Sequence, residues 1–216
     1  MIMIPGVLGE YFRPVGLPKT VLLLHMNSDF SDSSIVGSPP TVSNATIDTV
    51  TKKFGAGSGH IVPTDTVTYP ANNEGAWNFS GQNVTIDFWL NPSSWPISGN
   101  NSNILVVGLN TFAIGSTGPN WIRFDGGGVS TGAVTISSWT GSFKHIALVV
   151  NSGTWNLYLD GVSQASGSGS LGDFSANTVI LESGGDGATT YNIDELRIIN
   201  GAAYWTANFT PPTAEY

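Results

Sequence analysis

The sequence predicts an all-β protein, a sandwich of two antiparallel sheets with almost no helix, and three observations lead to this fold class. In residues 84–91 the apolar side chains Val84, Ile86, Phe88 and Leu90 recur at every second position, as in a strand with one face in a core. The 27 glycines and 12 prolines, with many Ser, Thr and Asn residues, indicate numerous tight turns. No stretch keeps a helical period for the roughly ten residues that a helix usually needs.

Predicted strands follow one another along most of the chain. The first is a continuous apolar run that ends before Asn27, which fits a strand buried on both faces or one near the closure of the sandwich. The last lies in a segment that Pro211 and Pro212 end, because proline cannot donate a ladder hydrogen bond. About twelve strands are predicted, at residues 20–26, 45–50, 61–62, 84–91, 104–108, 111–115, 121–125, 133–137, 144–150, 155–160, 178–182 and 192–199.

Turns and irregular segments are predicted between these strands. Residues 151–154 and the pair Asp160-Gly161 favour hairpin turns on either side of strand 155–160. Residues 164–172 are small and polar, so they are predicted to form a flexible loop. Further irregular segments are predicted at residues 38–41, 54–59, 92–103 and 67–81, the last with one short helical turn near 72–77.

Composition limits the classes of function. A chain of 216 residues with 40% hydrophobic and 10% charged residues is most simply one large β domain. The net charge of −8, with seven scattered Lys and Arg residues, argues against nucleic acid as a partner. The longest apolar runs are too short to span a bilayer, so no membrane association is expected. Cysteine is absent, which excludes disulfides and cysteine-based metal or redox chemistry.

The N-terminal residues 1–19 are predicted to lie outside the sandwich domain, which takes residues 20–216. They contain three glycines and three prolines and no core of their own. Two interpretations remain open: a partly ordered leader, or an arm that docks Tyr11 and Phe12 onto a neighbouring subunit. The segment lacks the basic start of a secretory signal.

The closing segment, residues 191–209, carries a family resemblance. It reads Tyr-Asn-Ile-Asp-Glu-Leu-Arg-Ile-Ile and continues to Ala-Asn-Phe-Thr-Pro-Pro, and Asp194 and Glu195 are predicted to point to opposite faces if this strand is extended. Together with residues 21–25, 84–90 and 155–161, it resembles the laminin-G-like jelly rolls of the concanavalin A-like lectin and glucanase superfamily, in the form common in bacteriophage virion proteins. The resemblance covers about residues 20–212 and implies a jelly roll, whereas one such scaffold hosts many functions.

No catalytic pattern is found. Gly167 to Gly172 matches a dinucleotide-binding pattern and Gly128 to Gly132 a nucleophile elbow, but both motifs need a helix that the sequence does not predict. Jelly-roll glucanases of the superfamily that the chain resembles carry Glu-x-Asp-x-Glu, or the same pattern extended by one residue, on one strand. None of the five glutamates of this chain stands in that pattern, so the protein is predicted not to be an enzyme.

Calcium is the candidate metal. Asn27, Asp29, Asp32 and Asp194, with backbone carbonyls, offer the hard oxygen ligands that this ion takes. Many laminin-G-like relatives hold an ion near the first loop and the closing strand. Asn27 stands where phage relatives usually have an Asp, which weakens such a site. The alternative is that these aspartates only cap loops.

Three tryptophans are candidates for a glycan site. Trp95, Trp121 and Trp139 lie at predicted loop edges, where an indole face stacks on a sugar while Asn and Asp bind its hydroxyls. Packing in the core or at its rim is the alternative for each. The three histidines, His25, His60 and His145, are not at metal-ligand spacing and are predicted to be structural.

The functional prediction follows from the resemblance to phage virion jelly rolls and from the lack of a catalytic motif and of a secretory signal. The chain is expected to be a non-enzymatic structural or decoration protein of a bacteriophage virion, on the capsid, tail or fibre, that displays a lectin-like sandwich able to bind glycans. Its partners would be other virion proteins, reached through residues 1–19, and further copies of itself. A secreted or cell-surface carbohydrate-binding lectin is the alternative, and a glycosidase comes last.

Overall fold

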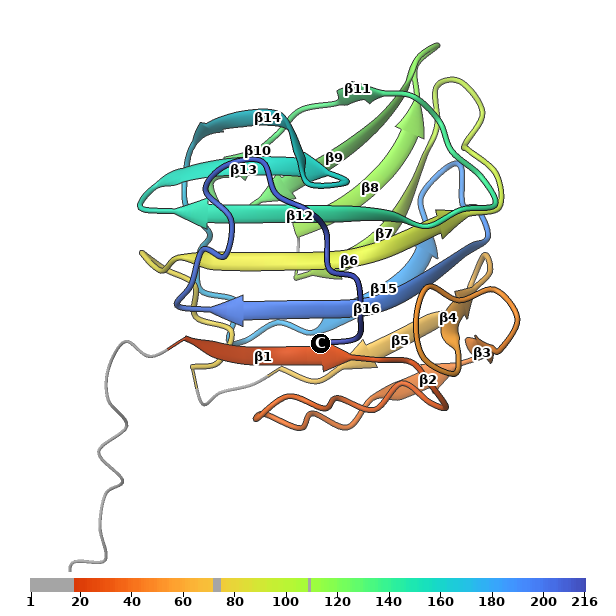
Figure 1. Ribbon diagram of the computed structural model, residues 1–216, viewed down its shortest axis with the longest axis horizontal. Coiled ribbons are helices and arrows are strands. Elements are labelled where there is room, and N and C mark those ends of the chain that lie inside the picture. Colours follow the sequence, from red (N-terminus) through yellow and green to blue (C-terminus); the bar gives the residue numbers. More distant parts are fainter. Residues whose placement is uncertain (1–17, 72–74, 109) are drawn as a thin grey trace, which may run out of the picture.

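The computed structural model describes residues 18–71, 75–108 and 110–216, and in it two antiparallel sheets face each other (Figure 1). The all-β sandwich predicted from the sequence is confirmed, and no helix occurs in the described part of the chain. None of these residues therefore forms a helix long and apolar enough to cross a membrane. The predicted docking residues Tyr11 and Phe12 lie outside the described residues.

The first sheet, sheet A, contains the closing strand near its centre. Its order is β14-β13-β12-β6-β16-β4-β3, and β1 pairs with the C-terminal half of β16. The strands are β1 (Lys19–Leu24), β3 (Thr46–Asp48), β4 (Ser58–Ile61), β6 (Val84–Pro92), β12 (Lys144–Asn151), β13 (Thr154–Leu159), β14 (Val162–Ser168) and β16 (Tyr191–Asn200).

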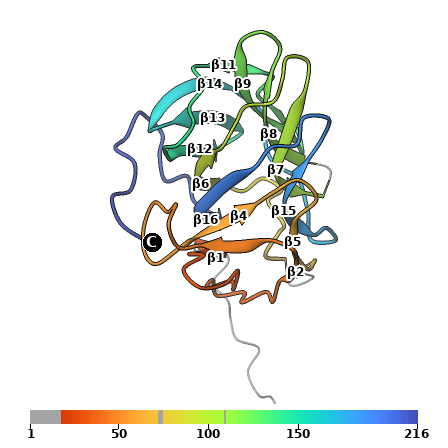
Figure 2. The same cartoon turned by 90° about the vertical axis from the view of Figure 1, so that its right-hand side faces the viewer.

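The second sheet, sheet B, covers the inner face of sheet A, as the side view in Figure 2 shows. Its order is β10-β9-β8-β7-β15-β5-β2, and β11 also pairs with β9. The strands are β2 (Thr41–Ser43), β5 (Thr66–Tyr69), β7 (Asn101–Val107), β8 (Asn110–Ser116), β9 (Asn120–Gly126), β10 (Val129–Ser130), β11 (Val134–Ile136) and β15 (Val179–Gly184).

The core lies between the two sheets and follows the predicted period of two. Val84, Ile86, Phe88 and Leu90 of β6 are all buried in it. Phe88 meets Phe112 of sheet B edge to face, with ring centroids 5.4 Å apart. Such aromatic contacts add to the free energy gained by removing apolar area from water.

Two segments predicted as irregular are strands. Residues 66–69 form β5, which pairs with β15 and β2, and residues 162–168 form β14 at the edge of sheet A, where a flexible loop was predicted. The side chains of β14 are small and polar, so its pairing rests on backbone hydrogen bonds that leave no apolar pattern. Residues 75–77 form a turn and not a helix; residues 72–74 lie outside the description.

A β-bulge in β16 changes the predicted direction of two carboxylates. The pairing with β6 shifts between Asp194 and Arg197, and Glu195 has a positive φ of 49°. In a regular strand, side chains that enter the core are two residues apart. The extra residue of the bulge makes this spacing three, so that Ile193 and Leu196 both enter the core. Asp194 and Glu195 therefore both point away from the core, so the expectation of opposite faces is wrong.

The C-terminal segment, residues 201–216, covers the outer face of sheet A and crosses β12, β6 and β16 in Figure 1. Trp205 and Phe209 of this segment pack on a second apolar cluster around Tyr158. The Phe209 N–H donates to the carbonyl oxygen of Gly161 at 2.9 Å. This cover explains why the outward side chains of β6, such as Asp87, are as buried as its core side chains.

The predicted hairpin turns before and after β13 provide a matched pair of glycines. Gly153 has a φ of 77° and open space where a Cβ would lie. Gly161 has a φ of 74°, and a Cβ there would collide with the carbonyl oxygen of Phe209. The left-handed conformation alone costs a non-glycine residue about 1 to 2 kcal/mol. An alanine at each position therefore loses the same backbone energy, and any additional loss of unfolding free energy at Gly161 measures how firmly the C-terminal segment is held.

We expect Gly153→Ala to lower the free energy of unfolding by about 1 kcal/mol, because only the backbone conformation is strained. Gly161→Ala should lower it by about 3 kcal/mol or more, because the C-terminal segment must also move. Urea denaturation followed by tryptophan fluorescence measures both changes. Equal losses of unfolding free energy in the two variants would show that the C-terminal segment does not pack against Gly161.

Candidate ligand-binding site

A pocket of about 410 Å³ opens at one end of the sandwich, where β6 ends and β16 begins. Two loops form it, residues 93–100 after β6 and residues 185–190 between β15 and β16. We call it the loop-end pocket. It is lined by Ser94, Trp95, Pro96, Ile97, Asn100, Gly185, Asp186, Gly187, Ala188 and Thr189.

Hydrogen bonds between the two loops fix the shape of the loop-end pocket. The Ser94 and Thr189 hydroxyl oxygens lie 2.7 Å apart, and the Thr189 hydroxyl also donates to the Ser94 carbonyl at 3.0 Å. Asn100 donates its side-chain amide to the carbonyl of Asp186 at 3.2 Å. These bonds join segments about ninety residues apart in the sequence. The pocket is therefore formed before any ligand arrives.

Two of the three predicted tryptophans meet behind this pocket. Trp95 and Trp139 pack edge to face with ring centroids 5.0 Å apart, and the Trp95 indole N–H donates to the Trp139 carbonyl at 2.8 Å. Trp139 donates in turn to the carbonyl of Leu90 at 3.1 Å and is only 8% exposed. Trp139 thus supports the pocket from the core, while the partly buried Trp95 lines it.

Trp121, the third predicted tryptophan, lies elsewhere. It is on β9 in sheet B, where its indole covers Gly115 of β8 and the Arg123 guanidinium lies 5.1 Å from its ring. Only 6% of Trp121 is exposed. The structure therefore does not bring Trp121 to the loop-end pocket.

The loop-end pocket combines apolar and polar groups that the sequence prediction missed. Ile97 is 75% exposed at its rim, and Asp186 and Asn100 supply a carboxylate and an amide. One carboxylate among the lining residues does not make the acid pair that glycoside hydrolysis needs. A partly buried indole beside an apolar rim and hydroxyl-binding groups is suited to holding a sugar. The only sequence signal was the aromatic Trp95 within a turn-rich segment.

The four residues predicted to bind calcium are engaged in separate hydrogen bonds. Asp32 accepts from the backbone of Leu23, Ser34 and Ser38, and Asp29 accepts from Ser31. Asn27 donates to Glu215, and Asp194 accepts from Lys53 and Phe54. Among the described residues, no three acidic or histidine side chains are grouped as a metal site would require. Calcium binding remains a prediction.

The electrostatic state of Asp194 is unusual. Burial raises the pKa of this carboxyl from 3.8 to about 6, although hydrogen bonds from the Phe54 and Lys53 N–H groups oppose the shift. Both bonds go to Oδ2, and Oδ1 has no protein partner. Burial likewise raises the pKa of Glu195, which accepts from the Tyr216 N–H and lies 3.0 Å from His25 Nδ1.

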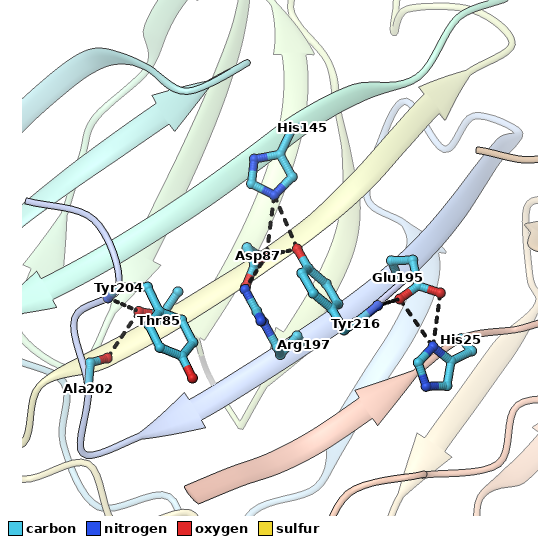
Figure 3. Close-up of polar contacts among 9 residues, drawn as sticks. All are labelled: His25, Thr85, Asp87, His145, Glu195, Arg197, Ala202, Tyr204 and Tyr216. Carbon is cyan, nitrogen blue, oxygen red and sulfur yellow. Dashed lines mark hydrogen bonds and ion pairs between the residues drawn. The ribbon is translucent and has the colours of Figure 1, made fainter. Parts of the chain in front are cut away.

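A network of buried charges continues from these residues under the C-terminal segment (Figure 3). Asp87 of β6 pairs with Arg197 of β16 through Nε at 3.1 Å and Nη2 at 3.2 Å. His145 Nε2 lies 3.2 Å from the same carboxylate, and the Tyr216 hydroxyl donates to it. The predicted structural role of His145 is consistent with this arrangement. These side chains connect three strands and the C-terminal segment.

Asp194 generates a prediction about pH. Its folded-state pKa of about 6 lies above its ordinary value of 3.8, so the unfolded chain loses this proton first as the pH rises. The stabilising contribution of the protonated carboxyl is complete below about pH 4 and is lost as the pH rises through 6. We expect Asp194→Asn to keep that contribution, so that its stability relative to the parent increases by about 2 to 3 kcal/mol between pH 4 and 7.

Urea denaturation at pH 4, 5, 6 and 7 in the presence of a chelator measures this effect. Asp29→Asn is the control, because a hydrogen bond from Ser31 lowers the pKa of the exposed Asp29 carboxyl. That variant should lose stability relative to the parent as the pH rises. Parallel profiles for Asp194→Asn and the parent would contradict the assignment.

Three solved structures show what the sandwich is similar to. The binding domain of Paraclostridial mosquitocidal protein 1 is 17% identical with a TM-score of 0.67, over 87% of this chain and 50% of that one. Domain 4 of AbnA, a GH43 extracellular arabinanase from Geobacillus stearothermophilus in complex with arabinotriose, is 18% identical with a TM-score of 0.66, over 86% and 94%. The binding domain of botulinum neurotoxin DC in complex with SialylT is 12% identical with a TM-score of 0.66, over 87% and 49%.

These similarities concern the fold. The chain spans about half the length of the two toxin binding domains and nearly all of the arabinanase domain. No curated protein matches the sequence. Residues 62–206, more than half of the chain, match the family described as the concanavalin A-like lectin/glucanases superfamily. The resemblance found in the closing segment is thereby confirmed at the level of the superfamily, and the chain belongs to the concanavalin A-like lectin/glucanase superfamily.

Proposed function

We propose that this protein is a lectin-like domain that binds glycans in the loop-end pocket without catalysing a reaction. The observation that carries the proposal is the position of Trp95, whose indole lines a preformed pocket beside the exposed Ile97 and the polar groups of Asn100 and Asp186. Sugars have apolar faces and polar edges, and this pocket offers both kinds of contact.

One comparison supports this proposal through its ligand. The arabinanase domain, 94% of which this chain covers, was solved with arabinotriose, so a domain of the same fold is found with a saccharide. The botulinum domain was solved with SialylT, but this chain covers only 49% of it, so that ligand is not assigned to the shared fold. Because the identity is below 20%, their binding residues are not transferred to this chain. The argument for binding rests on the pocket itself.

We further propose that the domain is displayed on a bacteriophage virion. The sequence of residues 191–212 supports this location, since it resembles the closing segment of phage virion jelly rolls. In this proposal residues 1–19 attach the domain to other virion proteins and the sandwich faces outward, where it meets host-surface or environmental glycans. A secreted or cell-surface lectin is the alternative location for the same binding activity.

Binding at the loop-end pocket can be tested with exposed residues whose replacement should not disturb the fold. We expect Ile97→Ser and Asp186→Ala each to weaken glycan binding about tenfold, equivalent to about 1.4 kcal/mol. A glycan array that includes bacterial polysaccharides identifies the ligand, and titration calorimetry measures the change. Val50→Ser is the matched control, because Val50 is at least as exposed as Ile97 but lies on the loop between β3 and β4 and does not line the pocket. Unchanged affinity in both pocket variants, or an array without signal, would contradict the proposal.

The virion location predicts that the intact parent particle contains this chain in multiple copies. Mass spectrometry of purified particles measures its abundance, and cryo-electron microscopy locates the sandwich on the capsid, tail or fibre. The expected density is an outward-facing two-sheet domain. Particles without the chain would refute the location and leave the binding proposal to its own test.

A further inference from the structure

A second hollow lies on the outer face of sheet A, about 430 Å³ in volume, between the end of β16 and the C-terminal segment. We call it the C-terminal hollow. Its main lining residues are Arg197, Tyr204, Trp205, Pro212, Glu215 and Tyr216. It is separate from the loop-end pocket, because the two share no lining residue.

Arg197 is held rigidly at the base of this hollow (Figure 3). Two of its guanidinium nitrogens bond to the buried carboxylate of Asp87, and its Cζ lies 3.5 Å from the centroid of the Tyr216 ring. His145 and the Tyr216 hydroxyl hold Asp87 from the other side. A guanidinium fixed in this way keeps its orientation when a ligand arrives. Its charge is already balanced by Asp87.

Two aromatic side chains of the hollow are also fixed. The backbone N–H of Tyr204 donates to the Thr85 hydroxyl at 3.0 Å, and the Tyr204 ring lies 4.9 Å from Arg197 Cζ while 51% of the residue is exposed. Trp205 is stacked on Phe209 with centroids 3.9 Å apart and planes 5° from parallel. Tyr204 therefore presents an aromatic face to solvent on a support that does not have to reorganise.

The charges of the hollow select the class of ligand. Glu215 adds a carboxylate that accepts from Asn27 at 2.7 Å, and the whole chain carries a net charge of −8. An anionic ligand meets this negative surplus, because Arg197 is neutralised by Asp87. A cationic ligand finds Glu215 as the one carboxylate side chain among the lining residues, and that carboxylate already accepts a hydrogen bond from Asn27. A neutral molecule with an apolar face and hydroxyl groups fits the stacking surface and the hydrogen-bonding groups.

We propose that the C-terminal hollow binds one neutral sugar unit, stacked on Tyr204, as a second saccharide site of the domain. The proposal deepens the proposed function, since it takes glycan binding at the loop-end pocket as given. The first half of β16 separates the two sites: one lies before Tyr191 and the other around Arg197, about 20 Å along the strand at about 3.3 Å per residue. A polysaccharide held at both places gains avidity without any new contact.

The test uses the full chain labelled with ¹⁵N. The indole N–H signals of Trp95 and Trp205 report on the two sites separately, and Trp95→Phe and Trp205→Phe assign them. Arabinotriose and neutral oligomers of glucose, galactose, mannose and N-acetylglucosamine are titrated in turn. We expect one of these probes to shift the Trp205 signal in a saturable manner, and Tyr204→Ala to weaken that binding at least tenfold. Tyr204→Phe should retain it, because the stacking face remains.

The outcomes separate this proposal from the proposed function. A Trp205 shift that Tyr204→Ala abolishes, while the Trp95 shift persists, supports a second site. A shift at Trp95 alone overturns the second site and leaves the first. No shift at either indole with any probe overturns both. A Trp205 shift that is unchanged in Tyr204→Ala also overturns the stacking on Tyr204, and thermal melting of each variant confirms that it is folded.

Discussion

The ion pair between Asp87 and Arg197 constrains the centre of this fold. The two residues lie opposite each other on β6 and β16, and Asp87 is fully buried. Breaking a buried pair by removing one partner typically costs about 3 to 5 kcal/mol, because the remaining charge is left without compensation. His145 from β12 and Tyr216 from the C-terminal segment bind the same carboxylate. One side chain therefore ties three strands and their cover together.

The β-bulge at Glu195 is what makes this pairing geometrically accessible. Without the extra residue, strict alternation after Ile193 would send Arg197 into the core and Leu196 out of it. The bulge places Glu195 at a φ of 49°, a conformation that costs a non-glycine residue about 1 kcal/mol or more. Contacts of the Glu195 carboxylate with His25 and the Tyr216 N–H offset that cost. The strained backbone of Glu195 thus lies two residues from Arg197, whose pairing with Asp87 depends on the bulge.

The sequence predicted those parts of the fold whose strands have an apolar face. Period two identified β6 and β13, and Asp160-Gly161 identified a hairpin turn, because each feature is local. β14 was missed because its side chains bury little and its stability comes from pairing with β13. The bulge was also missed, although the spacing of three between Ile193 and Leu196 is a local sign of it. A covering segment distant in sequence cannot be recognised from such patterns, so the burial of Asp87 was not predicted either.

The candidate site was predicted only in part, for a similar reason. Trp95 and Trp139 look alike in the sequence, and which of them lines a pocket depends on the loop at residues 185–190, far along the chain. Both sites adjoin β16: the loop-end pocket lies before its first residue, and Arg197 itself lines the C-terminal hollow. The Asp87–Arg197 ion pair therefore holds the strand that the two sites share. Their rim residues Ile97 and Tyr204 are 75% and 51% exposed, whereas Asp87 is fully buried. Substitution at the rim can therefore change the ligand at small cost in stability, whereas substitution of Asp87 leaves the charge of Arg197 without its partner.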